Sequence, residues 1–144
     1  MQVESLDHLV LTVANLERTL AFYTRVLGMH PLSSGQGRHA LALGDQKINL
    51  HLAGQEFDPK ALRPTPGSAD LCLITRSPLS RLLAHLGACG VEVIEGPVPR
   101  TGARGPMISV YLRDPDGNLL EVASYEEAKS LAVDETEGRG GRSA

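Results

Sequence analysis

The chain has 144 residues, 42% of them hydrophobic, and a formal net charge of −3. This length suits one domain or two small modules, and a charge so close to neutral argues against a nucleic-acid or membrane surface. No apolar run approaches the roughly 20 residues of a membrane span, and we expect no signal peptide. Cys72 and Cys89 stand in apolar surroundings without CxxC spacing, which predicts buried thiols in a reducing cytoplasm.

The first third of the chain predicts a strand, a helix and three more strands. Residues 6–13 are rich in apolar and β-branched types and lack Gly and Pro, as a strand requires. Asn15 offers a helix N-cap, the apolar residues that follow recur at helical spacing, and Gly28 fits the C-terminal end. Three shorter strands are expected at about 29–33, 38–43 and 47–52, with turn residues between them.

A second set of elements repeats this order. Residues 54–67 hold several prolines and glycines and predict a linker. A strand at 69–75 follows, and then a helix with Ser77 as its N-cap, Pro78 at its first position and Gly90 at its end. Further strands are expected at 91–95, 107–113 and 118–124. The polar tail at 126–144 is predicted to be disordered.

The two sets form an internal repeat. Residues 8–12 match 70–74, and 44–52 resemble 114–122 at a larger offset, which suits an insertion near residues 97–106. The pattern predicts an α+β fold of two βαβββ modules in a single domain at 1–125. Module one covers about 5–53, and module two covers about 68–125.

Potential metal ligands stand at matched positions of this repeat: His8 with Asp70, and His51 with Glu121. Strand alternation places Lys47, Asn49 and His51 on one face, opposite an apolar face that should meet a helix. Glu121 lies among apolar residues, where a lone carboxylate is costly unless it is paired or bound to a metal. Two imidazoles and one or two carboxylates suit a divalent ion such as Zn, Ni, Mn or Fe. Asp70 is the weakest member because its side chain is short, and it could instead bond backbone groups near the preceding turn.

Several segments resemble one known family. Residues 6–13, together with Phe22-Tyr23 and Leu27-Gly28, resemble the opening of vicinal-oxygen-chelate proteins, the glyoxalase/bleomycin resistance/dioxygenase superfamily. Residues 113–121 are similar to the closing segment of that family. Residues 47–51, 63–70 and 96–103 resemble its glyoxalase-domain virulence-type branch. The resemblance implies a cup-shaped mixed sheet with helices outside, one divalent metal held by His8, His51, Asp70 and Glu121, and a homodimer.

The leading functional hypothesis is a metal-dependent lyase or isomerase that resembles glyoxalase I and acts on a small, oxygen-rich, anionic metabolite. Glu121 would bind the metal and also move a proton. Candidate substrate contacts are Arg38, Lys47, Asn49, Arg63, Arg100, Ser109 and Tyr111. Arginines in the predicted loops at 63 and 100 suggest an acidic group on the substrate. The alternatives are a non-haem Fe²⁺ extradiol-type dioxygenase and a binding protein that sequesters a drug or metabolite without chemistry.

Overall fold

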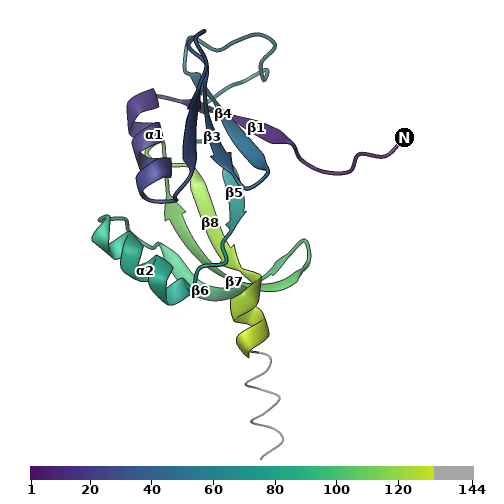
Figure 1. Cartoon of the computed structure of the whole chain (residues 1–144), viewed down its shortest axis with the longest axis vertical. Helices are drawn as coiled ribbons and strands as arrows, with labels where there is room; N and C mark the ends of the chain where they lie inside the picture. Colours follow the sequence, from purple (N-terminus) through teal and green to yellow (C-terminus); the bar gives the residue numbers. More distant parts are fainter. Residues whose placement is uncertain (132–144) are drawn as a thin grey trace, which may run out of the picture. The chain divides into compact units, whose positions relative to one another are not determined.

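The computed structural model describes residues 1–131, so the rest of the predicted tail, 132–144, lies outside the described residues. The chain divides into two compact units (Figure 1). Unit 1 contains Met1–Ala69 together with Asp114–Asn118, and unit 2 contains Asp70–Arg113 and, among the described residues, 119–131. Among the described residues, no helix is long and apolar enough to cross a membrane.

Unit 1 is a βαβββ module. Its elements are β1 (His8–Val13), α1 (Leu16–Arg25), β2 (His30–Ser33), β3 (His39–Leu43) and β4 (Gln46–Leu52). The sheet has the order β1-β4-β3-β2, in which β1 pairs with β4 in parallel and the other neighbours are antiparallel. The side chain of Asn15 caps α1 by accepting a hydrogen bond from the backbone of Arg18, as its position in the sequence predicts.

The core of unit 1 follows from strand alternation. Leu41 pairs with Ile48 and Leu11 with Leu50, and all four side chains are buried. Burying such apolar side chains supplies most of the driving force for folding. The opposite face of β4 therefore remains available for polar residues.

Unit 2 repeats the arrangement with β5 (Asp70–Ile74), α2 (Leu79–Ala88), β6 (Glu95–Gly102), β7 (Gly105–Arg113) and β8 (Leu119–Ser124). Its strand order is β5-β8-β7-β6, with β5 parallel to β8. Val110 pairs with Val122 and Leu112 with Leu120, and these side chains are buried. The predicted fold class, two mixed four-stranded sheets built from βαβββ repeats, is confirmed.

The third strand of unit 2 differs from the prediction. A strand was expected at 91–95, with a loop after it, whereas β6 begins at Glu95 and runs through Pro97 and Pro99 to Gly102. This strand lies at the edge of its sheet, where proline is tolerated because one side of the strand makes no ladder hydrogen bonds. Arg100 is therefore a strand residue and not a loop residue.

The start of α2 and the chain after β8 also differ from the prediction. Pro78 is the N-cap of α2 and no side chain of its own segment caps it, so the prediction of Ser77 as the cap is wrong. Instead, a carboxylate oxygen of Glu127 accepts a 2.9 Å hydrogen bond from the backbone of Leu79. Glu127 belongs to a third helix at residues 125–131, where the sequence predicted the start of a disordered tail.

The cysteines are less enclosed than predicted. Cys72 is exposed and Cys89 is half-buried, and both are free thiols. Cys72 shares the exposed face of β5 with Asp70 and Ile74, where alternation turns its side chain away from the half-buried Leu71 and Leu73. The prediction of buried thiols is therefore wrong for Cys72 and only partly right for Cys89.

The segment Asp114–Asn118 connects β7 to β8 and yet packs in unit 1. Asp114 accepts hydrogen bonds from the phenol of Tyr23 at 2.7 Å and from the side-chain amide of Asn118 at 2.7 Å. Asp116 accepts one from the backbone of Ala14, and Asn118 accepts one from the backbone of Ala69. These polar residues therefore hold the β7–β8 connection against the other elements of unit 1.

Candidate functional site

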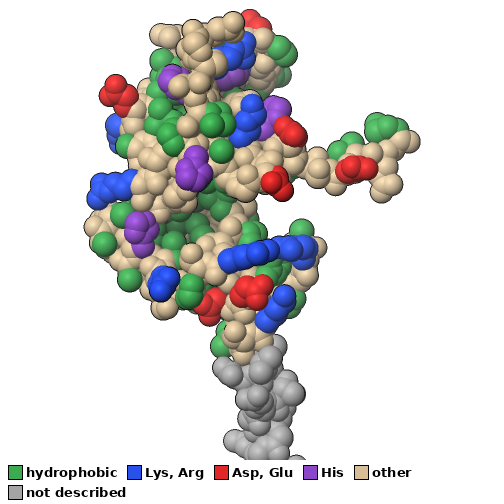
Figure 2. All heavy atoms as spheres, viewed as in Figure 1, with side chains coloured by type: hydrophobic (Ala, Val, Ile, Leu, Met, Phe, Trp, Pro, Cys, Tyr) green, Lys and Arg blue, Asp and Glu red, His purple; other side chains and the backbone are tan. Residues whose placement is uncertain are grey.

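One face of the unit 1 sheet carries the predicted polar residues. His8 pairs with Lys47, Val10 with Asn49 and Thr12 with His51, so these side chains share a face. On β3, Ala42 and Ala40 lie beside Lys47 and Asn49 on that same face. Figure 2 shows basic and histidine side chains over the part of the molecule where Figure 1 labels β1, β3 and β4. The predicted alternation of β4 is confirmed.

The two histidines expected to bind a metal stand apart along this face. Because His8 lies opposite Lys47 and His51 opposite Thr12, the histidines are four positions apart on neighbouring parallel strands. At a rise of about 3.3 Å per residue, this stagger is about 13 Å along the strands. The sheet therefore presents both imidazoles on one face without making them immediate neighbours.

His8 has a carboxylate partner that the sequence analysis missed. Its Nδ1 lies 2.7 Å from Oδ2 of Asp7, the preceding residue. A carboxylate on Nδ1 orients the ring and favours the tautomer in which Nε2 has a lone pair, an arrangement that is common among metal-binding histidines. The Asp-His dipeptide at the start of an apolar strand was the available signal.

A cavity of about 300 Å³ opens on the polar face of unit 1. It is lined by Arg38, Lys47, Asn49 and His51, together with Leu32, Ser33, Ser34, His39, Ala40, Leu50 and Phe57. Three of the predicted substrate contacts and one predicted metal ligand are thus brought together within a single unit. A volume of this size suits a small metabolite.

Phe57 is the lining residue that the sequence analysis missed. The guanidinium carbon of Arg38 lies 4.3 Å from the centroid of the Phe57 ring, and the His51 ring meets Phe57 edge-on at 5.6 Å. The Phe57 ring therefore packs against both Arg38 and His51. It stands in the stretch interpreted as a linker, where an isolated aromatic residue among polar neighbours was the only available signal.

In unit 2, the predicted carboxylates also share a face. Asp70 pairs with Leu119 and Cys72 with Glu121, so alternation places Asp70, Cys72 and Glu121 on the same side of β5 and β8. Ser109, which is fully buried, donates a 2.6 Å hydrogen bond from its hydroxyl to one carboxylate oxygen of Glu121. This bond fixes the orientation of the Glu121 carboxylate.

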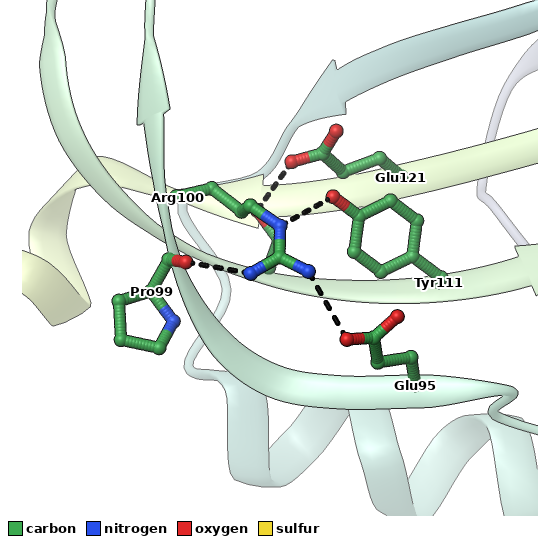
Figure 3. Close-up of polar contacts among 6 residues, drawn as sticks. Glu95, Pro99, Arg100, Tyr111 and Glu121 are labelled. Atoms are coloured by element: carbon green, nitrogen blue, oxygen red, sulfur yellow. Dashed lines mark hydrogen bonds and ion pairs between the residues drawn. The ribbon is translucent and has the colours of Figure 1, made fainter.

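Arg100 and Tyr111 form a second polar group beside Glu121 (Figure 3). The guanidinium of Arg100 donates to the Tyr111 hydroxyl at 3.0 Å and to a carboxylate oxygen of Glu95 at 3.1 Å. These hydrogen bonds raise the pKa of Arg100, with the Tyr111 bond as the largest cause. Arg100 was predicted to contact an acidic substrate, and its guanidinium already forms an ion pair with Glu95.

The thiol of Cys72 responds to its neighbours. Desolvation, followed by the negative charges of Glu121 and Asp70, raises its pKa to about 11. The carboxylates of Glu121 and Asp70 thus both act electrostatically on the Cys72 sulfur. At neutral pH the thiol is protonated and is therefore a weak nucleophile.

The donor types fit a divalent metal, but they are divided between the units. Among residues 1–131, no three His, Cys, Asp or Glu side chains gather closely enough to hold an ion. His8 and His51 belong to unit 1, whereas Asp70 and Glu121 belong to unit 2. The convergence of all four stays a prediction.

Arg63, another predicted substrate contact, is an exposed residue of the 53–69 segment and does not line the cavity described above.

Residues 5–122 match the sequence model of the glyoxalase/bleomycin resistance protein/dioxygenase superfamily. The chain belongs to this superfamily. It is 54% identical over 129 residues to the glyoxalase domain-containing protein RDO1 of Mycosarcoma maydis, covering 90% of this chain and 73% of RDO1. It is 51% identical over 125 residues to the virulence protein STM3117 of Salmonella typhimurium, covering 87% of both chains.

Solved structures share the fold of this chain. The integron cassette protein VCH_CASS1 of V. cholerae has a TM-score of 0.85 and 56% identity, covering 87% of this chain and 98% of the other. More distant relatives include the metallothiol transferase FosB of Shouchella clausii, 28% identical across 90% of this chain and 86% of FosB. Biphenyl-2,3-diol 1,2-dioxygenase 2 of Rhodococcus globerulus is 30% identical across 80% of this chain and 60% of that protein. A lactoylglutathione lyase from Agrobacterium tumefaciens, at 20% identity, shares the fold.

Proposed function

We propose that this protein is a divalent-metal-dependent lyase or isomerase of the glyoxalase-like type that acts on a small, oxygen-rich, anionic metabolite. The observation that carries the proposal is the cavity of unit 1, where His51 lies with Arg38, Lys47 and Asn49. A potential metal ligand, two cations and an amide on one cavity are the groups needed to hold an acidic substrate beside a metal.

The ligands in this proposal are His8, His51 and Glu121, with Asp70 as a fourth donor. Two neutral imidazoles and carboxylates suit Zn, Ni, Mn or Fe. When bound, such an ion would polarise substrate oxygens and stabilise negative charge that develops on them. The contact between Asp7 and His8 supports the ligand role because it leaves Nε2 of His8 as the donor atom.

The remaining roles fall to side chains of the two units. Arg38 and Lys47 would bind the acidic part of the substrate, and the amide of Asn49 would hydrogen-bond a hydroxyl or carbonyl oxygen. Glu121 would move a proton through its second carboxylate oxygen, since Ser109 already holds the first.

Metal content and proton exchange test this proposal together. Gently purified protein should carry about one divalent ion per chain by elemental analysis, and His51→Ala and Glu121→Gln should each lose most of it. Incubated in D₂O with a panel of small α-hydroxy and α-keto acids, the loaded protein should exchange a substrate carbon-bound proton for deuterium. EDTA should abolish that exchange. Protein that holds no ion at all, or exchange that persists unchanged in EDTA, contradicts the proposal.

A dioxygenase is the second candidate, favoured by the 30% identity to the biphenyl-diol enzyme. His8, His51 and Glu121 would then form a two-histidine, one-carboxylate set for Fe²⁺. Oxygen consumption on addition of catechol to Fe²⁺-loaded protein, without proton exchange, would select this candidate over the lyase. A ligand that binds with neither reaction would select a binding protein.

A further inference from the structure

The cavity of unit 1 has a cation near each end. Lys47 lies opposite Ala42, and Asn49 lies opposite Ala40, in the antiparallel ladder between β3 and β4. Continued by one residue past His39 and Leu50, the same register places Arg38 beside His51. Arg38 and Lys47 are therefore four positions apart along the sheet, a stagger of about 13 Å between their backbones.

Neither cation has a carboxylate partner in the part of the chain that the structure describes. Among residues 1–131, neither Arg38 nor Lys47 forms an ion pair with a carboxylate. Of the described residues, no Asp or Glu lines the cavity. Glu56, which interacts electrostatically with His51, instead accepts a hydrogen bond from the backbone of Gly54. Two unpaired positive charges on one concavity attract anions.

The Arg38 end is held in place. The guanidinium carbon lies 4.3 Å from the centroid of the Phe57 ring, a contact that restricts the orientation of the group. A planar fork of this kind matches the two oxygens of a carboxylate. Lys47, at the other end, supplies a flexible ammonium on a long side chain.

The region between the cations suits a short carbon chain. Ala40 is small and buried, and Leu32, a half-exposed side chain, stands beside it on β2. Asn49 adds one amide between the two charged ends. An apolar middle with one hydrogen-bonding group fits carbon atoms that bear at most a hydroxyl or a carbonyl.

We propose that this cavity binds a small dianion with an acid group at each end, namely a short-chain dicarboxylate. The inference rests on the proposed function in that it specifies the anionic substrate of the same site. It predicts that a ligand with two separated charges binds more tightly than one with its charge at a single point, because the backbones of Arg38 and Lys47 are about 13 Å apart along the sheet.

The test compares succinate, butyrate and inorganic phosphate by calorimetry at matched ionic strength. Succinate and butyrate have the same number of carbons and differ in the second carboxylate, whereas phosphate carries its charge at one point. The full chain is used after EDTA treatment, so that binding is measured without any metal. Since a hydrogen bond to a charged group contributes about 1.5–3 kcal/mol, succinate should bind about 10- to 100-fold more tightly than either control.

Single substitutions test whether Arg38 and Lys47 each bind one carboxylate of succinate. Arg38→Gln and Lys47→Gln should each lower succinate affinity to about that of butyrate. Arg18→Gln, at an exposed position of α1 outside the cavity, changes the net charge equally and should leave succinate affinity unchanged. Phosphate or butyrate binding as tightly as succinate, or an equal loss in Arg18→Gln, overturns the dicarboxylate assignment. Succinate binding by protein that holds no metal and exchanges no proton contradicts only the proposed reaction.

Discussion

The phenol of Tyr23 donates a 2.7 Å hydrogen bond to the carboxylate of Asp114, 91 positions later in the chain. Both side chains are buried, and Asp114 also accepts from the backbone N–H groups of Asp116 and Asn118. Burial, followed by the charge of Asp114, raises the pKa of Tyr23. Tyr23 is therefore a protonated hydrogen-bond donor at neutral pH.

We expect Tyr23→Phe to lower the free energy of unfolding by about 2 kcal/mol, because a buried carboxylate loses a donor. Urea denaturation measures the change. Tyr125→Phe is the matched control, since the Tyr125 hydroxyl accepts a single bond from the exposed backbone of Arg104. Equal effects of the two substitutions would show that the hydrogen bond between Tyr23 and Asp114 contributes no more to the free energy of unfolding than an exposed one.

Replacing Glu127 tests the contact between helix 125–131 and α2. Glu127→Ala should destabilise the protein by about 1 kcal/mol, because the first backbone N–H of α2 loses its acceptor and the helix dipole loses a favourable charge. Thermal unfolding is the measurement. Glu126→Ala, which removes only an exposed ion pair with Lys129 at 3.8 Å, should change stability by less than about 0.5 kcal/mol. Indistinguishable melting curves for the two variants would argue against the cap.

Alkylation reports the environment of Cys72. Because its pKa is raised to about 11, little reactive thiolate is present at pH 8, and the rate with iodoacetamide should climb steeply as the pH approaches 11. Peptide mass spectrometry of metal-free protein gives the rate at each pH. Glu121→Gln removes one of the negative charges and should move the midpoint to lower pH. A midpoint near 8.5, the value for an unperturbed thiol, would contradict the described surroundings of the sulfur.

Ser109→Ala tests whether the hydrogen bond that orients the Glu121 carboxylate supports metal binding. If Glu121 binds a metal, loss of its 2.6 Å partner should weaken metal affinity about 10- to 100-fold while the fold is retained. Calorimetric titration with Zn²⁺ measures the affinity, and circular dichroism checks the fold. Ser77→Ala, at an exposed position before α2, is the control and should have no effect. Unchanged Zn²⁺ affinity in Ser109→Ala would remove Glu121 from the proposed ligand set.

We also expect a homodimer. β1 and β5 are each an edge strand of their sheet, and Leu6 before β1 and Ile74 on β5 are exposed apolar residues. Unpaired strand edges favour association with a second chain. Light scattering should give twice the mass of one chain, and Ile74→Lys should shift the equilibrium toward the monomer, whereas Leu62→Lys, in an exposed loop, should not. A monomer at all working concentrations would refute this expectation.

Local patterns predicted most of the fold. The alternation in β4 and the helical spacing after Asn15 arise from neighbouring residues, so they are legible in the sequence. The failures involve distant partners. The cap of α2 comes from Glu127, 48 positions away, and β6 tolerates its prolines only because it is an edge strand. Neither the distant cap nor the edge position can be recognised from the neighbouring residues in the sequence.

The same distinction applies to the site. Alternation was enough to assign Lys47, Asn49 and His51 to one face. It could not reveal Phe57, whose place against Arg38 depends on how an irregular segment folds back over the sheet. It also could not show that Glu95 engages Arg100, since the acceptor lies on the same bent edge strand whose start was misplaced.

The placement of Asp114–Asn118 in unit 1 has a consequence for synthesis on the ribosome. β4 ends at Leu52, yet Tyr23 and the backbone of Ala69 receive their partners only when residues 114–118 have been made. At roughly 5–20 residues per second, the nascent module waits about 2–10 s for those partners after residue 69. During that interval the Tyr23 hydroxyl and the backbone of Ala69 lack their acceptors. A chain released early would therefore be the species most prone to aggregate or to be degraded.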